Sequence, residues 1–95
     1  MKNLPENVIA YKQTPEFNQE SVPAGLLKSH QTKAGTWGQI KILSGKLMYR
    51  ILEPELEEIE LSPERFGVVE PTVLHELVMT EPVRFQVIFL RVPQA

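Results

Sequence analysis

The sequence predicts an all-β domain, built as a small sandwich or barrel of about eight short strands. Two observations favour this class. Apolar residues rarely recur at the helical spacing i, i+3, i+4, i+7, whereas short runs of β-forming residues recur between glycines and prolines along the whole chain. A chain of 95 residues suffices for one domain with a modest core, so residues 1–95 are assigned to a single domain.

The expected strands follow from these runs and from the turns between them. The segment 13–23 contains Pro15 and Pro23 and is expected to be an irregular loop, with one helical turn at 15–18. Ser44 and Gly45 separate two apolar runs, which suits a tight hairpin in which the glycine supplies a positive φ. The strands are expected at residues 8–12, 26–32, 37–43, 47–52, 57–61, 66–70, 75–79 and 84–91.

The last expected strand, 84–91, is apolar on both faces. Phe85, Val87 and Phe89 alternate with Ile88 and Leu90, so neither face suits exposure to water. We expect this strand to be covered on both sides. A homodimer interface is one way to cover it.

Composition excludes several classes of function. There is no cysteine and no aspartate, which removes thiolate metal sites, disulfides and a Ser-His-Asp triad. The net charge is −2 and the basic residues are scattered, so nucleic-acid binding is not expected. No apolar run reaches membrane-spanning length, and Pro5, Glu6 and Asn7 stand where a signal peptide would be apolar. We therefore expect a cytoplasmic protein that does not contact membranes.

The two histidines are the candidate site residues. In a strand, His30 and Thr32 would share one face, and His75 would share a face with Leu77 towards the core. A histidine turned to an apolar interior needs partners for its ring nitrogens, and a metal ion or a hydrogen-bonding group can fill that role. Three further residues have two interpretations each: Trp37 and Tyr49 as pocket or packing residues, and Glu70 as a ligand or a strand-end acid.

Two segments of the chain resemble the two sequence blocks of a cupin barrel. The first is H-x-T-K-x-G-T-W-G, from His30 to Gly38, and the second is V-E-P-x-x-x-H, from Val69 to His75. Together with the opening LPENVIAYKQTPEF and the closing PVRFQVIFL, they are similar to the YeaR/TehB-like family of small cupin-like domains. The resemblance covers nearly the whole chain and implies a double-stranded β-helix, or jelly-roll, barrel.

The cupin resemblance implies a metal among two first-block histidines, a glutamate and a second-block histidine. His30 and His75 match two of these positions, Thr32 replaces the other histidine, and no glutamate follows before Gly45. The expected ligands are therefore His30 and His75, completed by Glu70, by Gln86 as an inward-pointing candidate, or by water. Trp37, Tyr49 and Thr32 would line the pocket. Zinc is the first choice of divalent metal, with nickel and iron as alternatives.

The family resemblance implies a function related to tellurite-resistance proteins. We expect a module that binds a metal or a small oxyanion ligand, and the alternatives are a metal-dependent oxygenase or isomerase and a structural dimerisation module. Longer family members carry a methyltransferase domain. These 95 residues have neither the length nor the glycine-rich strand-to-helix turn for one, so no S-adenosylmethionine binding is expected.

Overall fold

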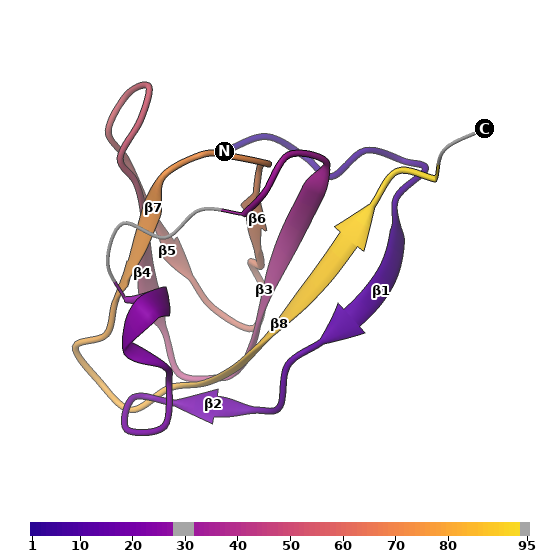
Figure 1. The fold of residues 1–95 in the computed structure, drawn as a ribbon. Coiled ribbons are helices and arrows are strands. Elements are labelled where there is room, and N and C mark those ends of the chain that lie inside the picture. Colours follow the sequence, from indigo (N-terminus) through magenta and orange to yellow (C-terminus); the bar gives the residue numbers. More distant parts are fainter. Residues whose placement is uncertain (28–31, 94–95) are drawn as a thin grey trace.

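The computed structural model describes residues 1–27 and 32–93, which form two antiparallel β-sheets packed against each other (Figure 1). The larger sheet has the order β1-β8-β3-β6, and β2 also pairs with β8. The smaller sheet has the order β5-β4-β7. The strands are β1 Ile9–Gln13, β2 Phe17–Asn18, β3 Thr36–Ser44, β4 Leu47–Ile51, β5 Glu57–Leu61, β6 Gly67–Val69, β7 His75–Val78 and β8 Arg84–Arg91.

The all-β prediction is confirmed, and three local predictions are wrong. The tight hairpin expected at Ser44 and Gly45 is not formed, because β3 belongs to the larger sheet and β4 to the smaller one; Gly45 has the expected positive φ, but in a connection between the sheets. The helical turn expected at 15–18 is instead β2, because Phe17 pairs with Phe85 of β8 and the two rings pack edge to face at 5.9 Å. The strand expected at 26–32 is not formed at its described ends. Leu26 closes a short 3₁₀ helix, Ala24–Leu26, and Leu27 and Thr32 lie outside strands. The middle of that expected strand, residues 28–31 with His30 among them, lies outside the described residues.

The core lies between the two sheets, and in β3 and β4 it is built by alternation along the strand. In β3, Ile40 and Ile42 point inward while Lys41 between them is exposed. Tyr49 of β4 and Phe85 of β8 meet them from the facing and neighbouring strands, and both are completely buried. The register pairs Ile40 with Val87 and Ile42 with Phe85, which puts one continuous apolar layer on the inner face of the larger sheet.

Strand β8 is flanked on both edges, by β1 and β2 on one side and by β3 on the other. Phe85 and Val87 face the core, and Leu90 on the opposite face is also buried. Ile88 is only partly buried. No helix in the described part of the chain is long and apolar enough to cross a membrane.

Candidate functional site

His75 begins β7 and lies in the interior between the two sheets. Only 4% of its surface is exposed, and its neighbour on the same face, Leu77, belongs to the core. The ring of Tyr49 packs edge-on against the imidazole, with centroids 5.5 Å apart and planes at 73°. The sequence-based prediction that His75 faces the core is therefore confirmed.

A backbone carbonyl orients the imidazole. Nδ1 of His75 lies 3.2 Å from the carbonyl oxygen of Val73, and a carbonyl can only accept a hydrogen bond. This contact favours the tautomer that is protonated on Nδ1, in which Nε2 carries the lone pair. Histidines that bind a metal through one ring nitrogen usually donate the N–H of the other to a carbonyl, a carboxylate or water. The contact with Val73 is compatible with that arrangement.

His75 and Thr32 line the same small, partly open cavity. Its volume is about 20 Å³, the space of roughly one water molecule. The Thr32 hydroxyl, also buried, donates to the carbonyl of Thr36 at 2.7 Å, so its oxygen keeps acceptor capacity. The remaining walls are apolar or glycine: Leu26, Gly38, Ile40, Val69, Leu77, Val87 and Phe89. The cavity therefore has a polar centre of one imidazole and one hydroxyl in apolar surroundings.

The structure does not bring the other expected ligands to this cavity. Glu70 lines a separate groove, where it lies 4.0 Å from the ammonium of Lys2. Gln86 lies between the core residues Phe85 and Val87 and pairs with exposed Lys41, so its side chain points away from the interior. The expectation that Gln86 points inward is wrong. Within residues 1–27 and 32–93, no three metal-ligating side chains form a cluster.

Two of the expected pocket residues occupy different places. Trp37 lies at a surface groove near Tyr11 and Arg91. Tyr49, by contrast, is completely buried beside His75, and its hydroxyl donates to the carbonyl of Val68 at 3.2 Å. Burial, reinforced by the negative charges of Glu70 and Glu57, raises the pKa of Tyr49 well above its ordinary value. Tyr49 is therefore a neutral hydrogen-bond donor at physiological pH.

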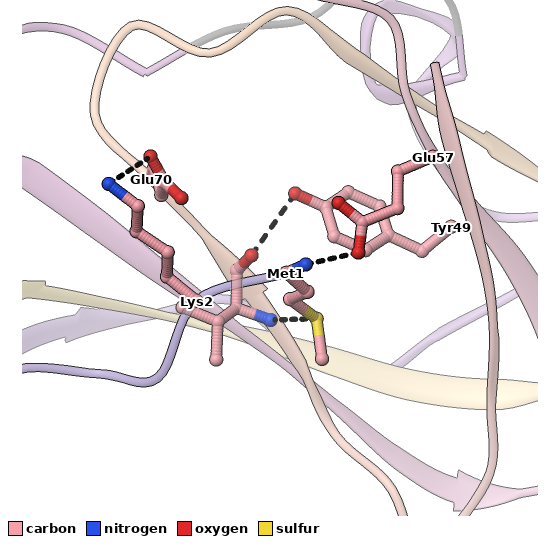
Figure 2. Close-up of polar contacts among 6 residues, drawn as sticks. Met1, Lys2, Tyr49, Glu57 and Glu70 are labelled. Atoms are coloured by element: carbon pink, nitrogen blue, oxygen red, sulfur yellow. Dashed lines mark hydrogen bonds and ion pairs between the residues drawn. The ribbon is translucent and has the colours of Figure 1, made fainter. Parts of the chain in front are cut away.

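On its far side, Tyr49 borders a groove that sequence reasoning missed (Figure 2). The groove is about 350 Å³ and contains the first two residues of the chain. The ammonium of Met1 pairs with the carboxylate of Glu57, and the sulfur of Met1 accepts a hydrogen bond from the N–H of Val68 at 3.2 Å. The contact with Val68 satisfies a backbone N–H of β6, the edge strand of the larger sheet. The sequence carries no signal for these contacts, because they join residues 56 and 67 positions apart.

Together, the fold and the site define a small two-sheet β domain with a small cavity lined by a buried histidine. The chain belongs to the TehB-like domain family, whose sequence profile matches residues 12–87. This confirms the family predicted from the two sequence blocks.

Relatives and solved structures agree with this assignment. A probable S-adenosyl-L-methionine-dependent methyltransferase, TehB of Haemophilus influenzae, is 35% identical over 81 residues, which are 81% of this chain and 27% of TehB. The uncharacterized protein YeaR of Escherichia coli is 26% identical over 99% of this chain and 87% of its own.

A crystal structure from E. coli strain K12 superposes with a TM-score of 0.87, at 25% identity, over 99% of this chain and all of that one. The crystal structure of H. influenzae TehB gives 0.82, at 27% identity, over 92% of this chain and 32% of TehB. The chain therefore spans about a quarter to a third of TehB and nearly all of YeaR.

Proposed function

We propose that this domain is a binding module that holds one divalent metal ion in the cavity beside His75. The observation that carries the proposal is the imidazole itself: buried among apolar side chains, oriented through Nδ1 by the Val73 carbonyl, and lining a cavity of about 20 Å³. A space of this size suits a metal ion or a water molecule and is far below the volume of an organic ligand site.

The ligand set that we propose is His75 and His30, completed by water. His75 would bind through Nε2, the nitrogen that carries the lone pair when Nδ1 donates to Val73. His30 is included because the family resemblance implies it, and it lies outside the described residues. Thr32 supplies a hydroxyl oxygen within the same cavity. Because the cavity itself has room for about one ion or water molecule, the completing water would lie at its open side. Zinc, nickel and iron all bind imidazole.

A small oxyanion ligand, expected from the resemblance to tellurite-resistance proteins, would bind on the metal or outside the cavity, because the cavity holds about one water-sized species. TehB of H. influenzae is named as a probable methyltransferase, but this chain matches 27% of it. The proposal therefore concerns the matched domain and assigns it neither methyl transfer nor S-adenosylmethionine.

The two alternative functions receive less support from the side-chain positions. A metal-dependent oxygenase or isomerase needs a third strong protein ligand, and Glu70 and Gln86 lie elsewhere in the fold. Homodimerisation remains a prediction from the apolar residues on both faces of β8 and is compatible with a binding module.

Metal titration by calorimetry tests this proposal. We expect zinc to bind the parent protein at one site, and His75→Gln and His30→Gln to weaken binding at least about tenfold. Glutamine keeps a polar side chain of similar length, and circular dichroism will verify the fold of each variant. Glu70→Gln and Gln86→Ala are the matched controls and should keep the parent affinity. Unchanged affinity in folded His75→Gln, or a loss confined to Glu70→Gln, would overturn the proposed site.

A further inference from the structure

A third concavity is lined by residues at the start of β1, the start of β3 and the end of β8. These strand ends lie in the upper right of Figure 1. The register aligns Ile9, Arg91 and Thr36 across the three strands, so these residues form one row. Lys33, before β3, and Tyr11, in β1, also line the concavity, together with Trp37 and the smaller residues of the neighbouring segments. We call this feature the Arg91 groove. Its volume of about 950 Å³ falls within the range of small-molecule sites.

The charge of the Arg91 groove is positive. Arg91 and Lys33 are both exposed, and no acidic residue stands among the described residues that line the groove. Within residues 1–27 and 32–93, neither Arg91 nor Lys33 forms an ion pair with a carboxylate. Two other arginines of the chain behave differently: Arg50 is paired with Glu58 and Glu76, and Arg84 with Glu16. Within the described part of the chain, no carboxylate neutralises the positive charge of the groove.

An aromatic ring fixes the guanidinium at the groove. The central carbon of the Arg91 guanidinium lies 4.9 Å from the centre of the Tyr11 ring, a cation–π arrangement. The Tyr11 hydroxyl lies 3.4 Å from Oγ1 of Thr36, which ties the ring to β3. Ile9 adds an apolar side chain that is 55% exposed. A pre-positioned guanidinium beside exposed apolar and aromatic surface is suited to an anion carried on an apolar body.

We propose that the Arg91 groove binds a small organic anion, a carboxylate, sulfonate or phosphate attached to a flat apolar group. The acidic group pairs with Arg91 and Lys33, and the apolar group lies against Tyr11 and Ile9. This site is separate from the His75 cavity, so it does not depend on metal binding there.

The test uses 8-anilinonaphthalene-1-sulfonate, an aromatic sulfonate whose fluorescence rises on binding. We expect saturable binding at low salt that weakens as salt is added. Amide chemical-shift changes in a nitrogen-15 NMR spectrum should centre on Tyr11, Gly35, Thr36 and Arg91. Arg91→Gln should weaken binding about tenfold, Lys33→Gln by a smaller factor, and Arg91→Lys should fall between Arg91→Gln and the parent because it keeps the charge but loses the planar donors.

Lys41→Gln is the control, since Lys41 is an exposed cation on β3 outside the groove. It should leave binding unchanged. The neutral compound N-phenyl-1-naphthylamine, which lacks the sulfonate, should bind more weakly than the sulfonate. Equal binding of both compounds, equal losses in Lys41→Gln and Arg91→Gln, or shift changes centred away from β1, β8 and β3 would each overturn the proposal.

Discussion

At the scale of single residues, Tyr49 lies between the cavity lined by His75 and the groove lined by Met1 and Lys2. Its ring packs against His75 on the cavity side, and its hydroxyl donates a hydrogen bond to the carbonyl of Val68 beside the groove. The sequence could predict His75 as a core-facing histidine, because alternation in HELV places it with Leu77. It left Tyr49 with two interpretations, because a large aromatic side chain in a strand suits both packing and a pocket.

Replacing Tyr49 by phenylalanine tests this role through stability. The variant leaves the Val68 carbonyl without its donor, which should cost about 1–2 kcal/mol of unfolding free energy at neutral pH. Denaturant unfolding will measure the loss, with Tyr11→Phe as a control at an exposed tyrosine. An unchanged free energy in Tyr49→Phe would show that the hydrogen bond contributes nothing.

The same variant should also respond differently to alkaline pH. The pKa of Tyr49 is raised in the folded protein, so above about pH 10 the unfolded chain loses this proton while the folded chain keeps it. The unfolded state then binds fewer protons, and stability falls as pH rises. The parent should therefore lose more stability than Tyr49→Phe between neutral pH and about pH 11. Parallel pH profiles of the two proteins would contradict the raised pKa.

At the scale of elements, the connection from β3 in the larger sheet to β4 in the smaller sheet depends on a single glycine. Gly45 has a φ of +79°, and a Cβ at this position would overlap the carbonyl oxygen of Pro82 in the turn before β8. The β3–β4 connection and the segment before β8 therefore fit together only without a side chain at position 45. Gly35 has a similar φ of +83° but open space around it, which makes it a natural comparison.

We expect Gly45→Ala to destabilise the protein by roughly 2–4 kcal/mol, because a strained backbone and a backbone overlap add together. Gly35→Ala should cost only about 1 kcal/mol, the backbone term alone. Urea unfolding of both variants measures the difference. Equal losses would mean that the backbone around Pro82 relaxes freely and that the close approach to Gly45 does not constrain the β3–β4 connection.

Element prediction from the sequence succeeded where one face was clearly apolar and failed where it was not. β3, β4 and β5 follow alternation and turn residues closely. Gln86 was assigned to the wrong face because β8 is apolar on both sides, so alternation gives no direction. β2 could not be predicted, because two residues form a strand only through pairing with β8 and packing of Phe17 on Phe85.

At the scale of the whole molecule, the first residue of the chain completes the edge of the larger sheet. Met1 lies beside β6 and contacts Glu57 of β5, so it bridges the two sheets (Figure 2). Neither the sheet order nor this bridge follows from local pattern, because both depend on residues far apart in sequence. The two-layer architecture itself did follow, from the number and spacing of short strands.

Extending the chain before Met1 should weaken this bridge. A Gly-Ser extension removes the ammonium at Met1, and we expect the Tm to fall by roughly 3–8 °C, the equivalent of about 1 kcal/mol. In a Glu57→Gln background the same extension should have a smaller effect, because its ion-pair partner is already gone. Glu60→Gln, which removes an exposed pair with Lys46, is the control. An extension that lowers the Tm equally in all three backgrounds would contradict the bridge.

The measurement that tests the central proposal most directly is anomalous X-ray diffraction at the zinc edge, from crystals of the protein grown with zinc. The account predicts one strong anomalous peak within coordination distance, about 2.0–2.1 Å, of Nε2 of His75, inside the cavity shared with Thr32. It also predicts no such peak in crystals of His75→Gln. A peak only at surface carboxylates, or a cavity without anomalous signal at saturating zinc, would contradict a metal-binding role for His75.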